Sequence, residues 1–258
     1  MISKKELENH IEFLKKDVFF VKNKWPHFDL LFKDLNFYSK EYINKNVLFL
    51  ERTGLYGDIS LFAPLFFKSK VTSIDCSSKA LVKRGAYNKK FVKNNKILKW
   101  PTNKKIEIEK LNFYNKKFDL IIIPNLIHHV RNQNTLFKKC YKFLKKGGKL
   151  YIFEPLVREL HQQPEDYLRY TPNGLSVILG DNKFKTKKIK NCGGPFSVVA
   201  YCLDQAIQYL PENKKKTFYK NFKLNDFKKL IYLDKKYKKN LVRKNTSFPM
   251  SYSLLVQK

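Results

Sequence analysis

The chain has 258 residues, with 53 Lys and Arg against 22 Asp and Glu, which gives a formal net charge of +31. Hydrophobic residues make up 43% of the chain, which is enough for a sizeable core and argues against wholesale disorder. No uncharged apolar run approaches the roughly 18 residues of a membrane-spanning helix, and charges interrupt the N-terminus before a signal peptide could form. Four widely spaced cysteines without a CxxC pair fit a reduced, cytoplasmic chain.

The basic charge does not favour a nucleic-acid partner. Only 6 of the 53 basic residues are Arg, whereas nucleic-acid sites use the bidentate guanidinium for phosphate and base contacts. The lysines are spread over the whole chain. We therefore expect a solvated basic surface and regard nucleic acid as an unfavoured partner.

Strands and helices alternate along the chain. Ser3 and Glu6 have the spacing of a capping box that starts a helix, and Trp25-Pro26 ends the periodic pattern that follows. Gly147-Gly148 is expected to stop a later helix in the left-handed conformation. We predict strands over 47–50, 71–74, 106–111, 118–123, 150–153, 184–190 and 252–256, and helices over 28–35, 78–94, 134–146, 172–180 and between about 196 and 239.

This order predicts an α/β fold of right-handed βαβ units, with a mostly parallel sheet and helices on both faces. We expect a helical cover over residues 1–45 and a single domain over residues 46–258, with a helical insertion at about 196–239. The segment 196–207 is apolar almost all round. It fits a buried helix, the wall of an acceptor pocket or a dimer contact. A homodimer is therefore one of the alternatives that the sequence leaves undecided.

Ligands of open α/β sheets bind beyond the carboxyl ends of the strands. Gly54 and Gly57 follow the first strand, and Asp75 ends the next one, 21 residues after Gly54. Glycine lets the backbone approach a ligand, and a carboxylate at the second strand can accept both hydroxyls of a ribose. The two features together favour nucleotide binding over a plain turn and a helix-capping Asp.

Four segments resemble the motifs of class I S-adenosylmethionine-dependent methyltransferases of type 11: VLFLERTGLYGDIS, VTSIDCS, FDLIIIPNLIHHV and FLKKGGKLYIFEP. The resemblance covers about residues 44–190. It implies a Rossmann-like, seven-stranded sheet of order 3-2-1-4-5-7-6 with the last strand antiparallel, and S-adenosylmethionine as cofactor. The stretch HQQPEDYLRYTP, from His161, is similar to a motif of methyltransferases in cell-surface glycan biosynthesis. It implies a small-molecule or sugar-containing acceptor.

The resemblance also implies roles for individual residues. The cofactor-binding positions are Glu51, Gly54, Gly57, Asp75, Cys76, Glu107 and Asn125. His161 is the leading candidate for a general base, with His129 as the second, because both follow strands that end near the transferred methyl group. Tyr167, Arg169 and Tyr170 are the candidate acceptor contacts. For the histidines the alternative is a structural residue, for Glu107 a solvent-facing charge, and for the last three a packed loop.

The chain departs from the family in its first loop, where Glu51, Arg52 and Thr53 stand in place of the first glycines. One alternative is therefore a degenerate domain that binds or scaffolds without catalysis. Another is an RNA or DNA methyltransferase built on the same domain. No metal-ligand spacing is visible in the sequence, and an activated sulfonium methyl requires no metal.

Overall fold

The protein is described here by a computed structural model. It covers residues 2–15, 27–52, 61–76, 98, 104–161, 163–221, 224–237 and 247–258. Gly54, Gly57 and the helix expected over 78–94 lie outside these residues.

The sheet has seven strands in the order β3-β2-β1-β4-β5-β7-β6. Strands β1, β2, β3, β4 and β5 pair in parallel, whereas β7 pairs antiparallel with both β5 and β6. This confirms the strand order implied by the class I methyltransferase motifs. The strands are β1 (Asn46–Glu51), β2 (Lys70–Asp75), β3 (Lys104–Lys105), β4 (Phe118–Pro124), β5 (Leu144–Pro155), β6 (Lys185–Cys192) and β7 (Ser251–Gln257).

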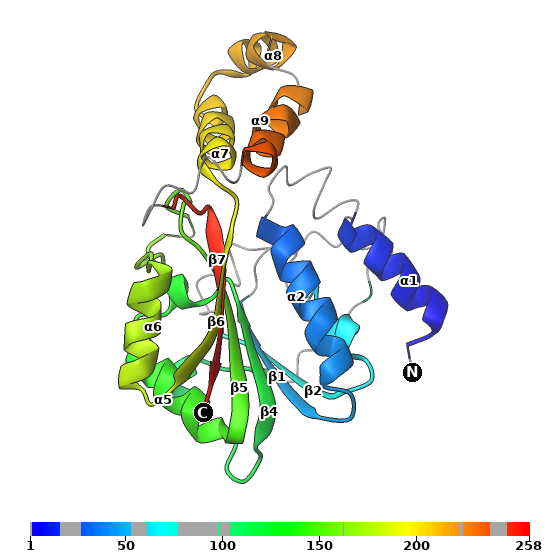
Figure 1. Cartoon of the computed structure of the whole chain (residues 1–258), viewed down its shortest axis with the longest axis vertical. Helices are drawn as coiled ribbons and strands as arrows, with labels where there is room; N and C mark the ends of the chain where they lie inside the picture. The colour runs from blue at the N-terminus through cyan, green and yellow to red at the C-terminus, as the bar shows by residue number, and fades with distance from the viewer. Residues whose placement is uncertain are drawn as a thin grey trace.

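Alternation along the strands builds two cores, one on each face of the sheet. In β1, Phe49 packs into one hydrophobic cluster and Leu48 into the other. The first cluster lies under α1 (Lys4–Phe13) and α2 (His27–Glu41), and the second under α5 (Gln133–Phe143) and α6 (Pro172–Asp181) (Figure 1). Helices therefore cover both faces, as expected. The capping box of α1 is confirmed, with Ser3 and Glu6 bonding reciprocally.

A buried carboxylate fixes α2 to the sheet. Asp34 is 3% exposed and accepts hydrogen bonds from the hydroxyls of Tyr151 (3.1 Å) and Ser253 (2.9 Å). Lys190 on β6 forms an ion pair with the same side chain. One side chain thus ties the N-terminal helical cover to three strands.

Two local expectations are wrong. The range 106–111, predicted as a strand, holds no strand, since β3 ends at Lys105. It instead contains the 3-10 helix η3 (Ile108–Lys110), because Ile108 and Leu111 both enter the core at helical spacing. The helix over 134–146 stops at Phe143, since Leu144 already pairs with Phe118 in the sheet. Gly147 does adopt a left-handed φ of 74°, but within β5 and not at the helix end.

Between β6 and β7, the described residues form three helices: α7 (Pro195–Gln208), α8 (Glu212–Asn221) and α9 (Leu224–Lys236). They lie beyond one end of the sheet (Figure 1) and share a separate small core that includes Val198, Ile207 and Met250. Asp234 accepts the backbone N–H of Ser197 (2.8 Å), which joins α9 to the start of α7. Within the described residues, no helix is both long and apolar enough to cross a membrane.

Candidate active site

The candidate site lies where β4 and β5 end side by side. Pro124 pairs with Phe153, so Glu154 follows directly opposite the turn that leaves β4. In that turn Asn125 adopts a left-handed φ of 52°, which Asn tolerates better than most residues, and its N–H bonds to the carbonyl of Phe153 (2.8 Å). The chain then enters the short helix η4 (Ile127–His129).

Glu154 anchors this turn. The residue is 3% exposed, and its Oε1 accepts the backbone N–H groups of Leu126 (2.9 Å) and Ile127 (2.8 Å). Its Oε2 lies 2.5 Å from Nδ1 of His128, whose side chain is also buried. A buried carboxylate is tolerated only when it is well bonded, and these three contacts hold both the turn and the imidazole in place.

His129 is positioned by the loop that follows β5. Its Nδ1 lies 2.5 Å from the backbone carbonyl of Glu165, so Nδ1 carries the hydrogen and Nε2 the lone pair. Burial and the neighbouring His128 lower the pKa of His129 to about 2. The ring is therefore neutral at physiological pH.

His161 is held by Asp166. Asp166 Oδ2 lies 3.0 Å from Nδ1 of His161 and accepts its backbone N–H at 2.9 Å. Burial, followed by the charge of Arg158, lowers the pKa of His161 to about 4. Burial by itself would raise the pKa of Asp166, but hydrogen bonds from Arg169 and His161 hold it below its usual range.

Arg169 binds the carboxylate of Asp166, which contacts His161. Its two terminal nitrogens contact the two carboxylate oxygens of Asp166, and they also bond to the carbonyls of Leu168 (2.9 Å) and Glu159 (3.2 Å). The sequence predicts an acceptor contact for this guanidinium, whereas both of its terminal nitrogens bond to the protein. These contacts hold Asp166, which in turn contacts His161.

Arg52 occupies the interior beside the cluster. Its side chain is 4% exposed, and one terminal nitrogen lies 2.5 Å from Glu165. Burial lowers the pKa of Arg52, while the carboxylates of Glu165, Asp75 and Asp166 act to raise it. Arg52 therefore links β1 to the loop that carries His161. β1 precedes the loop whose sequence lacks the first glycines of the family motif.

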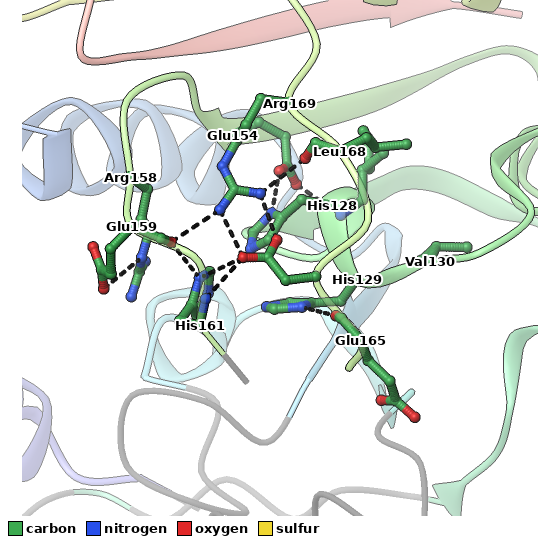
Figure 2. Close-up of polar contacts among 12 residues, drawn as sticks. His128, His129, Val130, Glu154, Arg158, Glu159, His161, Glu165, Leu168 and Arg169 are labelled. Carbon is green, nitrogen blue, oxygen red and sulfur yellow. Dashed lines mark hydrogen bonds and ion pairs between the residues drawn. The ribbon is translucent and has the colours of Figure 1, made fainter. Parts of the chain in front are cut away.

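The three imidazoles face one another (Figure 2). Ring centroids lie 4.0 Å apart for His128 and His129, 4.8 Å for His129 and His161, and 5.3 Å for His128 and His161. One ring nitrogen from each lies within 4.8 Å of the others. Sequence spacing could not show this group, because His129 and His161 lie 32 positions apart.

On the cofactor side, Asp75 is 3% exposed at the end of β2 and pairs in register with Glu51 at the end of β1. The Glu51 carboxylate accepts a hydrogen bond from Ser73 (2.6 Å). Cys76 follows Asp75, packs partly buried against the core, and has its pKa raised by burial. These three residues lie at the carboxyl ends of β1 and β2.

The other residues predicted from the sequence to bind the cofactor or the acceptor differ in exposure and contacts. Glu107 is exposed and forms an ion pair with Lys110 at 2.7 Å, which fits its reading as a solvent-facing charge. Tyr167 is 44% exposed and its N–H bonds to the carbonyl of His128 (2.8 Å), so it borders the imidazoles. Tyr170 packs against the core, and its carbonyl accepts the hydroxyl of Tyr252 (2.7 Å).

Sequence reasoning had not assigned functional roles to His128, Glu154, Arg52 and Asp166. For Glu154 a signal existed, because a carboxylate at the end of β5 must lie next to the turn that leaves the neighbouring parallel strand β4. For Asp166 no signal existed, since its partners are set by the path of an irregular loop.

The fold and this edge of the sheet define a class I methyltransferase fold. Residues 56–152 match the family model of the methyltransferase domain. This stretch is therefore similar to a methyltransferase domain, in agreement with the resemblance that the sequence motifs indicate.

Individual relatives agree with this assignment. A phosphoethanolamine N-methyltransferase of Plasmodium falciparum is 30% identical over 158 residues, which make up 57% of this chain and 55% of that protein. The chain thus matches about half the length of this curated relative. A solved Bacillus halodurans protein with a provisional methyltransferase name has a TM-score of 0.51 at 18% identity, over 88% of this chain and 98% of that one.

The fold alone does not fix the reaction. The cyclase SpnF superposes with a TM-score of 0.51 at 14% identity, over 90% of this chain and 80% of that one. That protein is named for a cyclisation, although its fold is similar. Function must therefore be argued from the site.

Proposed function

We propose that this protein transfers the methyl group of S-adenosylmethionine to a small acceptor. The observation that supports this proposal is that the candidate cofactor residues and the imidazoles lie at the same end of the sheet. The buried Asp75 ends β2, and the three imidazoles gather beyond β4 and β5, on the other side of β1. The strand order reverses between β1 and β4, and ligands of doubly wound folds bind at such a point.

The residues divide into two roles. Asp75 accepts the ribose hydroxyls of the cofactor, with Glu51 and Cys76 beside it, and Asn125 lies beneath the transferred methyl group. Tyr167 borders the acceptor. Gly54 and Gly57 belong to the same proposed site by sequence alone, as they lie outside the described residues.

Methyl transfer is a single displacement. A lone pair on the acceptor oxygen or nitrogen attacks the methyl carbon, and the carbon–sulfur bond breaks with its electron pair going to sulfur. The acceptor's proton passes to a basic nitrogen of the imidazole cluster, directly or through a water molecule. His161 is the first candidate for this nitrogen and His129 the second.

The finer proposal concerns the acceptor. The stretch that begins at His161 supports a sugar-containing metabolite, nucleotide- or lipid-linked, used in cell-surface glycan biosynthesis. The Plasmodium falciparum relative is named for phosphoethanolamine, so a small phosphate-bearing amine is the second candidate. Both are small polar molecules that would lie against Tyr167 and His161.

Calorimetry with S-adenosylmethionine and S-adenosylhomocysteine tests the cofactor step. We expect binding of both, and a loss of roughly 10–100-fold in affinity for Asp75→Ala, the size of a lost charge-assisted hydrogen bond. Asp181→Ala removes an exposed carboxylate at the end of α6 and is the matched control. Absence of heat with either ligand would support the scaffold alternative.

A labelled-methyl assay then tests the acceptor. The panel holds nucleotide sugars, a lipid-linked sugar, phosphoethanolamine and a structured RNA. Transfer to a sugar supports the proposal, transfer to phosphoethanolamine selects the second candidate, and selective transfer to RNA overturns the small-molecule assignment.

A further inference from the structure

Each imidazole of the cluster has its Nδ1 atom engaged by the protein. Nδ1 of His128 contacts the carboxylate of Glu154, and Nδ1 of His129 contacts the carbonyl of Glu165. Nδ1 of His161 contacts Asp166 at 3.0 Å and the carbonyl of Glu159 at 3.2 Å. Histidines that bind metals through Nε2 are oriented by such contacts, in which the other ring nitrogen donates to a carboxylate or a backbone carbonyl.

An unpartnered nitrogen lies inside the same cluster. Nε2 of His128 is buried and has no hydrogen-bond partner among the described residues, although the side chain is only 2% exposed. A buried polar atom without a partner costs about 1–3 kcal/mol. Such an atom, on a ring that packs against two further imidazoles, indicates a missing ligand.

The charges around the cluster favour a cation. Glu154, Glu159, Glu165 and Asp166 are the carboxylates in contact with the histidines or their supporting loop, and the guanidinium groups there are those of Arg52, Arg158 and Arg169. Among these described residues, the carboxylates outnumber the guanidinium groups by one, beside neutral rings.

We propose that His128, His129 and His161 form a binding site for a divalent cation of the zinc class. Three imidazole nitrogens suit Zn²⁺ and its neighbours, whereas Mg²⁺ and Ca²⁺ prefer oxygen ligands. Bonds of about 2.0–2.1 Å in tetrahedral geometry place ligand nitrogens about 3.4 Å apart. One ring nitrogen of each histidine lies within 4.8 Å of the others, so a small inward shift of the rings completes the set.

Three protein ligands leave the fourth position of a tetrahedral ion open, which is typical of catalytic sites. In a part of the inference that rests on the proposed function, this position takes the acceptor hydroxyl. The cation lowers the pKa of that hydroxyl, its proton leaves to solvent water, and the oxygen forms the bond to the methyl carbon as the carbon–sulfur bond breaks. His161 then serves as a ligand and the proton leaves through water.

Cobalt binding tests the site without requiring turnover. The full chain is stripped with a chelator and titrated with Co²⁺, whose visible absorption reports four-coordinate geometry, and Zn²⁺ is then added in competition. We expect one equivalent with a four-coordinate spectrum. His161→Gln should abolish the spectrum, and Asp166→Asn should weaken binding roughly 10–100-fold through the lost supporting contact.

His10→Gln is the control, because it removes a buried histidine that bonds to Leu61 and lies outside the cluster. Circular dichroism establishes that each variant is folded. Unchanged cobalt binding in His161→Gln, or a substoichiometric adventitious ion only, would overturn the site.

Calorimetry with S-adenosylmethionine on the stripped protein separates the two proposals. Cofactor binding without cobalt binding refutes the metal site and leaves the proposed function standing. Cobalt binding without cofactor binding supports the metal site and removes the acceptor role assigned to it.

Discussion

Glu154 and His128 join the ends of two neighbouring strands through a single contact, with Oε2 of the carboxylate 2.5 Å from Nδ1 of the imidazole and both side chains buried. The other carboxylate oxygen accepts two backbone N–H groups of the turn after β4. One residue at the end of β5 therefore determines the path of the chain that carries two of the three clustered histidines.

Glu154→Gln should destabilise the fold. The variant keeps the size of the side chain but loses its charge, and an amide nitrogen is brought toward a ring N–H or the turn amides. Leaving one buried donor without an acceptor costs about 1–3 kcal/mol, and urea unfolding measures the change. Glu109→Gln, an exposed substitution on η3, should leave the midpoint unchanged. Equal midpoints for the two variants would remove the anchoring role of Glu154.

If His161 is the general base, the role that the proposed function gives it, His161→Ala should lower turnover by roughly 10²–10⁴-fold, measured once the methyl acceptor is identified. The affinity for S-adenosylmethionine should stay the same, because Asp75 ends β2, which lies on the other side of β1 from the imidazoles. Steady-state kinetics and calorimetry on the same preparation check both parts. Wild-type turnover would transfer the role to His129 or to alignment of an already nucleophilic amine.

Arg169→Lys distinguishes positioning from acceptor contact. A lysine cannot reproduce the two-point contact with Asp166, so His161 loses its orientation. We expect kcat to fall with little change in KM for the acceptor. A raised KM at constant kcat would show that the guanidinium contacts the acceptor, as the sequence had suggested.

Asp34→Ala should lower the free energy of unfolding by about 3 kcal/mol, because it leaves a buried tyrosine hydroxyl and an ammonium group without their partner. Adding Tyr151→Phe removes the orphaned hydroxyl, so the double variant should lose less than the sum of the single losses. Denaturant unfolding of the wild type, the two single variants and the double variant completes the double-mutant cycle. Strict additivity would mean that the 3.1 Å contact contributes nothing.

Stability should fall as the pH is lowered below neutrality. Burial lowers the pKa of His10, whose Nε2 contacts the carbonyl of Leu61 at 2.7 Å. Below the unfolded-state pKa of about 6.5, the unfolded chain binds a proton at His10 that the folded chain does not bind. The free energy of unfolding therefore decreases as the pH falls toward the lowered pKa.

His10→Gln should therefore reduce the difference in stability between pH 7.5 and 5.5 relative to the wild type. His129 and His161, whose pKa values are also lowered, act in the same direction in both proteins. Chemical denaturation at several pH values measures the difference. Parallel stability curves would show that His10 titrates alike in both states.

The sequence by itself determined the class of fold. Apolar runs such as Leu120 to Ile123 are buried on both faces, which only a parallel sheet covered by helices allows, and the spacing of the motifs fixed the strand order. It also placed Asp75 at a strand end, because that position depends only on where a strand stops.

Tertiary structure alone decided how the polar side chains meet. His128, His129 and His161 come together because the loop after β5 folds back over the end of β4, and Arg169 turns inward because Asp166 lies beside it. Contacts between segments about 30 residues apart follow from loop paths and packing. No local pattern records them, whereas strands and helices follow from periodicity that neighbouring residues already carry.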